Sequence, residues 1–279
     1  MTTSDTEKKA RLFNPEPEPV RLWLHEVERT WSNIPELDLR GSEFKHLAII
    51  CDGNRRAAED RGLNPAWGHR VGVETIKGIM EAGKKWEVDN LTFWVWSTEN
   101  WQRDKGQVDF IMNLATRFIN QQDFINKFLE NQTRFVHLGR KDRLPISLSQ
   151  AIEALERKTA GFNQRTINLA MDYGGIDEIS RAVFRLTQQA EAGRFNLTDL
   201  INDPETIQNF LDTGDQPKPD LVIRTGVKPG EIPHTSGFMP IQTAYAGWCF
   251  EETLFPNLTP EQIRKSINQF IGYKRRMGK

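Results

Sequence analysis

The sequence predicts an α/β fold with a mostly parallel central sheet flanked by helices. Two observations support this prediction. Short apolar runs alternate along the chain with longer segments in which apolar residues recur at helical spacing. The runs are also apolar at successive positions, as expected for strands that are buried on both faces.

Each predicted element follows from its local pattern. The predicted strands are the apolar runs at residues 46–51, 91–97, 134–139, 166–171 and 220–225. The predicted helices have helical apolar spacing and cover residues 21–31, 67–85, 107–129, 147–159 and 177–192. A last helix should begin at Thr259, because Thr259, Pro260 and Gln262 supply an N-cap hydroxyl, a proline at the first helical position and a capping box.

We expect one main domain, because the 279-residue chain shows no sharp internal shift in composition. Residues 1–40 are interpreted as a mobile tail followed by a docking helix. The tail runs to about residue 20 and is polar and rich in proline, whereas the helix carries Leu22, Trp23, Val27 and Trp31 on one side. Residues 41–279 are expected to form the single domain.

Composition excludes several classes of protein. A formal net charge of -1 provides no basic field for nucleic acid, so no nucleic-acid partner is expected. The apolar runs are shorter than the roughly 20 residues that span a bilayer, and the polar N-terminus lacks a signal sequence, so a cytoplasmic protein is expected. Cys51 and Cys249 form no disulfide framework or zinc motif and are interpreted as buried structural residues. P-loop, dinucleotide-binding, zinc-protease and serine-hydrolase motifs do not occur in the sequence.

Polar clusters follow three of the predicted strands, where ligands gather in open α/β sheets. The clusters are Asp52-Gly53-Asn54-Arg55-Arg56, Ser97-Thr98-Glu99-Asn100-Trp101-Gln102-Arg103 and Arg224-Thr225-Gly226. Arginines pair with phosphate, and a carboxylate can hold Mg²⁺, so the three clusters together indicate a site for an anionic substrate. Asp-Gly-Asn alone would be an ordinary turn. His69, near a helix start, could either donate to a phosphate or cap the helix.

The order of these motifs resembles the cis-prenyltransferases, the undecaprenyl diphosphate synthase family. The resemblance covers about Lys45 to Gly278 and is carried by the three clusters together with Gly68-His69, Asp172-Tyr173-Gly174-Gly175 and Gln242-Thr243-Ala244-Tyr245. It implies an enzyme that condenses isopentenyl diphosphate onto an allylic prenyl diphosphate with cis geometry. It further implies Mg²⁺, a homodimer and an α/β fold with a hydrophobic tunnel.

The resemblance also implies a role for each motif residue. Asp52 would hold the metal and, with Asn100, act in catalysis, Asn100 by assisting proton removal. Residues expected to bind the allylic diphosphate are Gly53, Asn54, Arg55, Arg56 and His69. Residues expected to bind the second diphosphate, or to lie beside it, are Ser97, Thr98, Glu99, Trp101, Arg103, Arg224, His234 and Ser236. Arg276, in Arg276-Met277-Gly278, would reach the partner subunit's site.

The tunnel would be lined by an apolar stripe on the helix at 107–129. Its members are Phe110, Ile111, Leu114, Ala115, Phe118 and Ile119, although such a stripe more often belongs to plain core.

Four positions depart from the family pattern. Ala57 stands where the family has a tryptophan, and Pro65 stands where it has an arginine. The loop after Arg224-Thr225-Gly226 is longer than in the family, and His234 stands near the place of another expected arginine. Gly247 occupies the place of a second acidic metal ligand, for which either Glu251 or water and substrate oxygens would have to substitute.

The expected activity is synthesis of a Z-polyprenyl diphosphate of the carrier-lipid type, with peripheral membrane contact through the lipid product. Two alternatives remain: a noncatalytic subunit that partners an active chain, and some other phosphate-binding α/β enzyme. The sequence does not determine the product length or the preferred primer.

Overall fold

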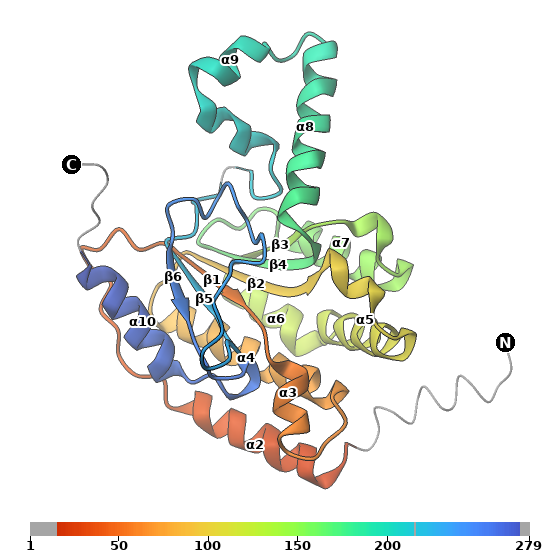
Figure 1. The fold of residues 1–279 in the computed structure, drawn as a ribbon, viewed down its shortest axis with the longest axis vertical. Helices are drawn as coiled ribbons and strands as arrows, with labels where there is room; N and C mark the ends of the chain where they lie inside the picture. Colours follow the sequence, from red (N-terminus) through yellow and green to blue (C-terminus); the bar gives the residue numbers. More distant parts are fainter. Residues whose placement is uncertain (1–15, 215, 274–279) are drawn as a thin grey trace, which may run out of the picture.

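A six-stranded sheet forms the centre of the protein (Figure 1). The structure is a computed structural model that describes residues 16–214 and 216–273. All neighbouring strands pair in parallel, in the order β3-β4-β2-β1-β5-β6. The strands are β1 (His46–Ile50), β2 (Asn90–Ser97), β3 (Thr133–Leu138), β4 (Arg165–Tyr173), β5 (Leu221–Arg224) and β6 (Gly247–Phe250). The predicted fold class is confirmed.

Helices alternate with the strands along the chain. They are α2 (Glu18–Ser32), α3 (Asn54–Glu59), α4 (Ala66–Lys85), α5 (Lys105–Ile119), α6 (Gln122–Glu130), α7 (Ile146–Thr159), α8 (Gly175–Glu191), α9 (Leu197–Asn202) and α10 (Pro260–Gly272). Four 3₁₀ turns complete the described part: η1 (Thr98–Gln102), η2 (Lys141–Arg143), η3 (Pro204–Phe210) and η4 (Phe255–Asn257). The capping box predicted at Thr259 and Gln262 is present at the start of α10.

Successive side chains of a strand point to opposite faces of the sheet, and both faces are buried here. Leu47 and Ile49 of β1 join a large core that includes residues of α2, α4, α5, α6 and α7. Ala48 and Ile50 join a smaller cluster on the other face, which includes Phe238. This arrangement explains why the strands have apolar residues at successive positions instead of an alternating pattern.

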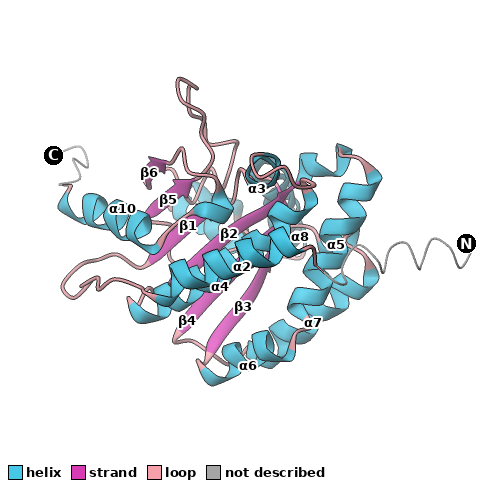
Figure 2. Cartoon of the chain, turned by 90° about the horizontal axis from the view of Figure 1, so that it is seen from below, coloured by secondary structure: helices cyan, strands magenta, loops and turns pink. Residues whose placement is uncertain are grey.

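Helix α2 packs across α4, on the outside of the large core (Figure 2). Its apolar face buries Val20, Trp23 and Trp31. A Cβ atom at Gly78 would lie 2.2 Å from the Trp31 ring, so only glycine permits this close approach. The helix begins at Glu18, three residues before the predicted start, so the prediction of a mobile tail is wrong for residues 18–20, and residues 1–15 lie outside the described residues.

The prediction of one long helix at 107–129 is wrong. The segment forms α5 and α6, which are separated at Asn120 and Gln121, where Gln121 takes an extended backbone conformation. Phe118 and Phe124 pack together across the break, with ring centroids 4.1 Å apart, so the turn lets both helices face one aromatic cluster. Strand β6 was not predicted, because its four residues begin with glycine and form no long apolar run.

Candidate active site

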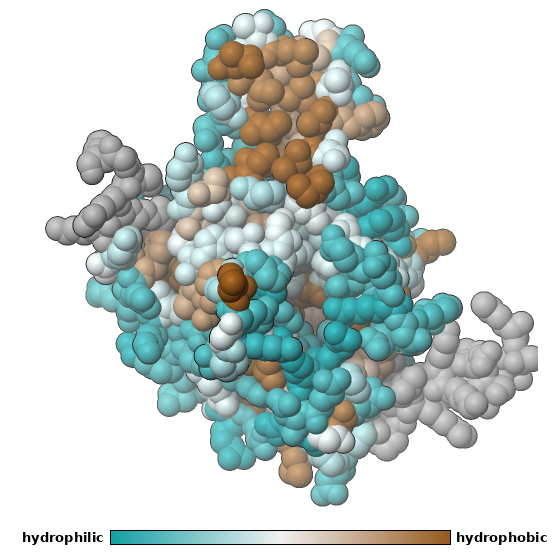
Figure 3. All heavy atoms as spheres, in the orientation of Figure 1, coloured by the Kyte–Doolittle hydropathy of each residue, from teal (hydrophilic) through white to brown (hydrophobic). Residues whose placement is uncertain are grey.

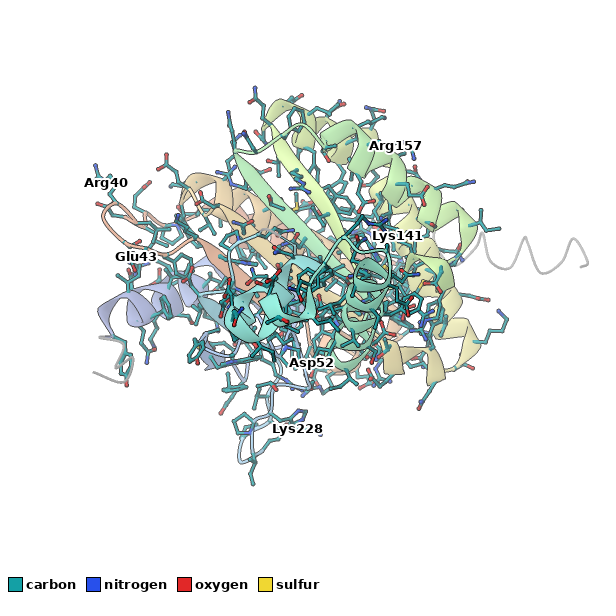
Figure 4. All side chains as sticks on the ribbon, turned by 90° about the horizontal axis from the view of Figure 1, so that it is seen from above. Arg40, Glu43, Asp52, Lys141, Arg157 and Lys228 are labelled. Atoms are coloured by element: carbon teal, nitrogen blue, oxygen red, sulfur yellow. The ribbon has the colours of Figure 1, made fainter. Side chains whose placement is uncertain are left out.

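The three predicted polar clusters lie together at the carboxyl edge of the sheet. Strand β1 lies between β2 and β5, and parallel pairing brings their carboxyl ends to the same edge. The residues around this edge enclose an open cavity of about 1040 Å³. Figure 4 shows Asp52 near the base of the loop that carries Lys228, which also lines the cavity. Predicted site residues that line it are Asp52, Gly53, Asn54, Arg55, Arg56, His69, Ser97, Glu99, Asn100, Arg103, Arg224 and Ser236.

The turn between β1 and α3 holds the Asp52 carboxylate open to the cavity. Gly53 has a φ of 99°, and a Cβ atom there would lie 2.7 Å from the Leu254 side chain. The Gly53 N–H donates to Asp52 Oδ1 over 2.6 Å, and Asn54 Nδ2 donates to the Cys51 carbonyl over 2.8 Å. The Asp52 side chain nevertheless remains 43% exposed, so it can reach a ligand.

Two guanidinium groups flank this carboxylate. Arg56 and Arg224 each place a terminal nitrogen 3.4 Å from an Asp52 oxygen. Arg56 also donates to the Gly226 carbonyl over 2.6 Å. Arg224 is buried, and its other terminal nitrogen donates to Ser236 Oγ over 2.7 Å and to the His234 carbonyl over 2.6 Å. Each arginine therefore contacts Asp52 and also donates to neutral acceptors, and both line the cavity, where a guanidinium can pair with a phosphate.

The η1 turn brings the second cluster to the cavity. The Ser97 N–H donates to Asn100 Oδ1 over 3.1 Å, as part of a capping box that fixes the Asn100 side chain. The Arg103 guanidinium lies over the Trp96 ring, 5.3 Å from its centroid. Burial, and then the nearby Arg55, lower the pKa of Arg103. The cavity thus concentrates positive charge, which favours an anionic ligand.

His69 lines the cavity, and its imidazole is uncharged at neutral pH. Burial lowers its pKa to about 3, with further contributions from Arg103 and Arg55. Its Nε2 atom is buried and has no hydrogen-bond partner among the described residues. A Cβ atom at the preceding Gly68 would lie 1.8 Å from the Asn54 carbonyl oxygen, so this glycine lets α4 begin directly against the β1–α3 turn. A neutral imidazole here can donate one hydrogen bond without adding charge.

A second, mainly apolar cavity of about 70 Å³ adjoins the first. The two share Cys51, Asn54, His69 and Val95 as lining residues. Most of the predicted α5 stripe lines the apolar cavity, namely Ile111, Leu114, Ala115, Phe118 and Ile119. Phe110 does not line it and packs edge-on against Trp67. Burial raises the pKa of the Cys51 thiol well above its usual value, so Cys51 is a neutral wall residue and not a nucleophile.

Three predicted site residues among those that the structure describes do not line the cavity. Thr98 and Trp101 do not line it, although they belong to the same turn as Asn100. His234 does not line the wall but contacts Arg224 through its carbonyl and its ring Nδ1. Arg276 lies outside the described residues. Residues that line the cavity without having been assigned there include Trp96, Gly226, Lys228, Pro229, Gly230 and Glu231.

The carboxylates do not form a preassembled metal cluster. Among residues 16–214 and 216–273, no three His, Cys, Asp or Glu side chains are grouped as metal ligands. Glu251 follows β6. Its Oε1 accepts hydrogen bonds from Cys249 Sγ and from Ser266 Oγ of α10, so the carboxylate lies against α10. Gly247 begins β6 opposite Leu221, at the amino edge of the sheet, where a Cβ atom would lie 2.7 Å from the Phe270 ring. Neither Gly247 nor Glu251 lines the cavity, whereas Asp52, Glu99 and Glu231 do, and of these Asp52 lies between Arg56 and Arg224.

A polar, arginine-rich cavity beside an apolar one, at the carboxyl edge of a parallel sheet, is typical of an α/β enzyme whose substrate has an anionic and an apolar portion. The family model described as "Putative undecaprenyl diphosphate synthase" matches residues 50–278. The chain therefore belongs to the undecaprenyl diphosphate synthase family, the cis-prenyltransferases, and is a prenyltransferase.

Individual relatives agree with this assignment. The chain is 36% identical to an isoprenyl transferase of Thermus thermophilus over 86% of this chain and 90% of that protein. It is 37% identical to an isoprenyl transferase of Wolinella succinogenes over 85% and 97% of the two chains. The crystal structure of a probable undecaprenyl diphosphate synthase from Campylobacter jejuni aligns with a TM-score of 0.67 and 32% identity, covering 85% and 100%. Lavandulyl diphosphate synthase from Lavandula x intermedia, solved with dimethylallyl diphosphate, aligns with a TM-score of 0.77 and 28% identity, covering 84% and 98%.

Proposed function

We propose that the protein condenses isopentenyl diphosphate with an allylic prenyl diphosphate and releases a Z-polyprenyl diphosphate of the carrier-lipid type. The observation that carries the proposal is the junction of the two cavities at Asn54 and His69. A diphosphate can bind among the arginines while its hydrocarbon chain enters the apolar cavity. A substrate with one charged end and one apolar end requires both environments.

The residues at the cavity suit each step of this reaction. The allylic carbon–oxygen bond would break and diphosphate would leave with the electron pair. The isopentenyl double bond would form the new carbon–carbon bond, and that unit would lose a proton to the released diphosphate. Arg56 and the neutral His69 would stabilise the departing diphosphate by hydrogen bonding. Arg224, Ser236 and Arg103 would hold the isopentenyl diphosphate, and Asn100 would lie near the proton that leaves.

Mg²⁺ is the cofactor that we propose, and the donor set fits it with one protein ligand. Asp52 offers an exposed carboxylate beside the arginines. Mg²⁺ usually retains water and binds through one or two carboxylates together with substrate phosphate oxygens. When bound, the ion would neutralise charge on the diphosphate. Asp52 would hold it, and Glu251, which points to Cys249 and Ser266, would not.

We further propose that two copies of the chain form a homodimer. Helices α8 and α9 project from the body, and Figure 3 shows a hydrophobic patch over them. Its exposed apolar side chains are Ile176, Val183, Phe184, Leu197 and Ile201. Patches of this kind on a folded protein are typical of protein–protein interfaces. In this assembly Arg276 would complete the partner's site.

The proposed location is the cytoplasm, with peripheral membrane contact through the lipid product. No helix within the described ranges is both long and apolar enough to cross a membrane. Both cysteines are free thiols, in keeping with a reducing compartment.

The decisive experiment is an incorporation assay with radiolabelled isopentenyl diphosphate. Purified protein is incubated with Mg²⁺ and allylic primers of increasing length, and the products are separated by chain length. The proposal predicts Mg²⁺-dependent extension with cis double bonds, and carrier-lipid length would establish the product class. No extension with any primer would contradict the enzyme proposal, and activity that appears only after a second chain is added would favour a noncatalytic subunit.

A further inference from the structure

The Asp172-Tyr173-Gly174-Gly175 motif lies beside the reaction cavity but contributes none of its lining residues. Within the pairing of β2 and β4, Trp96 is opposite Met171 and Ser97 is opposite Tyr173, so Asp172 occupies a bulge. Its φ is 53°, a left-handed conformation that asparagine and aspartate tolerate better than other non-glycine residues. Bulges of this kind redirect a side chain.

The redirected carboxylate is fully buried and accepts hydrogen bonds from two side chains. Asp172 Oδ1 accepts from Trp101 Nε1 over 2.8 Å. Arg143 Nε donates to Asp172 Oδ2 over 2.8 Å, and a second Arg143 nitrogen donates to Oδ1. The Asp172 side chain is 0% exposed and that of Arg143 is 38% exposed. The ion pair therefore fixes the orientation of the carboxylate that receives the Trp101 indole.

Trp101 belongs to the η1 turn, and the period of that turn explains its orientation. Residues three apart lie above one another in a 3₁₀ helix. Trp101 and Thr98 accordingly lie on one side of the turn, Trp101 against Asp172 of β4 and Thr98 against Gly174, whereas Ser97, Glu99, Asn100 and Arg103 line the cavity. A Cβ atom at Gly174 would lie 2.6 Å from Thr98 Oγ1, so the same motif contacts the turn at a second point.

The Trp101 ring also supports the cavity wall. It packs edge-on against Trp96 with centroids 5.7 Å apart, and Arg103 lies over the Trp96 ring. A connected set of contacts therefore leads from Arg143 through Asp172 and Trp101 to Trp96 and Arg103. Movement of Trp101 would displace both the Asn100 turn and the ring on which Arg103 rests.

We propose that Asp172 is a positioning residue that holds Asn100 and Arg103 against the reaction cavity through the Trp101 indole N–H. This inference rests on the proposed function, because it concerns the geometry of the same site. Asp172 itself touches no substrate. It specifies the place of the η1 turn, whereas the turns that carry Asp52 and Arg224 are held by other contacts.

Hydrogen exchange of the 97–103 segment tests this inference without requiring turnover. Trp101→Phe removes the indole N–H and keeps an aromatic ring, and Asp172→Asn neutralises the acceptor with a residue that suits the left-handed backbone. Each variant should accelerate exchange in this segment roughly 10- to 100-fold, the range expected for loss of a hydrogen bond to a charged group. Trp86→Phe is the matched control, because Trp86 is also buried and donates over 2.8 Å to Pro35, away from the cavity.

Steady-state kinetics supply the second readout. Both site variants should lower kcat about tenfold and raise KM for isopentenyl diphosphate more than KM for the allylic primer, because Arg103 moves with the turn. The double variant should show less than the sum of the single effects, since both changes break one contact. Trp86→Phe should leave kcat and both KM values unchanged.

The outcomes separate this inference from the proposed function. Unchanged exchange at 97–103 in Trp101→Phe and Asp172→Asn would overturn the positioning role even if the wild-type protein is active. Faster exchange throughout the molecule, without a local excess at 97–103, would overturn it as well. Absence of wild-type turnover with faster local exchange in the variants would overturn the proposed function alone. If Trp101→Phe does not fold, the comparison between Asp172→Asn and Trp86→Phe decides.

Discussion

A terminal nitrogen of Arg224 lies 3.4 Å from the Asp52 carboxylate, and this contact joins the carboxyl ends of β1 and β5 across the floor of the cavity. The Asp52 side chain is 43% exposed, whereas that of Arg224 is 11% exposed. In this pair, Arg224 is buried and held by its hydrogen bonds, whereas the Asp52 carboxylate is accessible to a ligand. A ligand can reach Asp52 without displacing Arg224 from its contacts with His234 and Ser236.

Arg224→Lys tests the role of the fixed arginine. Lysine keeps the positive charge but has one terminal nitrogen. It therefore cannot donate to Ser236 and to a diphosphate through two separate nitrogens, as arginine can. KM for isopentenyl diphosphate should rise roughly 10- to 100-fold, the range for lost hydrogen bonds to a charged group. KM for the allylic primer should change much less. Arg40→Lys, at an exposed ion pair with Asp38, is the control and should change neither. Equal increases in both constants would show that Arg224 does not distinguish the two diphosphates.

Asp52→Asn tests the open carboxylate. We expect kcat to fall by about 10²- to 10³-fold, as when one preorganised electrostatic group is removed from a site. Thermal stability should change little, because the ion pairs of Asp52 are long and partly exposed. Asp38→Asn, at an exposed position, serves as the control for kcat. Turnover close to that of the wild-type protein would refute the metal and catalytic assignment of Asp52.

The site was predictable from sequence where it depends on strand ends. A short apolar run followed by Asp52, Ser97 or Arg224 locates the end of a strand, and parallel pairing then brings these ends together. The orientation of residues within the η1 turn was not predictable, because the sequence did not indicate a 3₁₀ period. Thr98 and Trp101 were therefore grouped with Asn100, although Trp101 contacts Asp172 of β4 and Thr98 lies against Gly174.

Contacts across long loops were not predictable from local patterns, and only the family resemblance grouped Ser236 with Arg224. The loop after β5 carries Lys228 and Glu231 to the cavity wall and places Ser236 against Arg224. No local pattern specifies that return, because it depends on the path of the intervening residues. In the same way, the motif spacing pointed to Gly247 as the place of a missing metal ligand. The register of β5 and β6 instead locates Gly247 at the amino edge, opposite Leu221.

Gly247→Glu should therefore destabilise the protein without changing its Mg²⁺ requirement. A Cβ atom at this position would lie 2.7 Å from the Phe270 ring, and overpacking of this kind typically costs about 1–3 kcal/mol. Gly161→Glu is the matched control, since nothing lies within 4 Å of a Cβ atom there. The measurements are the free energy of unfolding and the Mg²⁺ concentration for half-maximal rate. A large fall in that concentration in Gly247→Glu would place the glycine near the metal after all.

Glu251→Gln addresses the other proposed ligand. Glutamine can still accept hydrogen bonds from Cys249 and Ser266, so the protein should fold. The Mg²⁺ concentration for half-maximal rate should stay within about twofold of the wild-type value, because a twofold change is less than about 0.5 kcal/mol of binding free energy. A steep increase in that concentration would mean that Glu251 turns toward the metal during the reaction.

Three buried histidines should make the protein less stable in mild acid. Burial lowers the pKa of His46 to about 4, of His69 to about 3 and, with Lys141 nearby, of His137 to about 4. In the unfolded chain these groups have pKa values near about 6.5 and take up protons first. Their contribution to stability is therefore present above about pH 6.5 and is lost as the pH falls from there toward about 4.

His46→Gln measures how much one buried histidine contributes to the pH dependence of the free energy of unfolding. His46 is 0% exposed, and its ring contacts the Pro217 carbonyl and the Thr92 hydroxyl, each at 2.7 Å. The loss of unfolding free energy between pH 7 and pH 5, measured with denaturant, should be about 1–2 kcal/mol smaller in this variant than in the wild-type protein. His25→Gln, at an exposed ring paired with Glu28, should not alter that loss. An identical pH dependence in all three proteins would show that His46 titrates normally in the folded state.

Phe184→Glu tests the proposed dimer face on α8. The Phe184 side chain is 62% exposed, so a charge there should leave the fold of the single chain intact. In a dimer the same charge would be buried without a partner, which is strongly unfavourable. Sedimentation should show a dimer for the wild-type protein and a monomer for the variant at the same concentration. Leu22→Glu on α2, where the side chain is 58% exposed, is the control and should stay dimeric. A wild-type monomer, or a variant that remains dimeric, would exclude this face as the subunit interface.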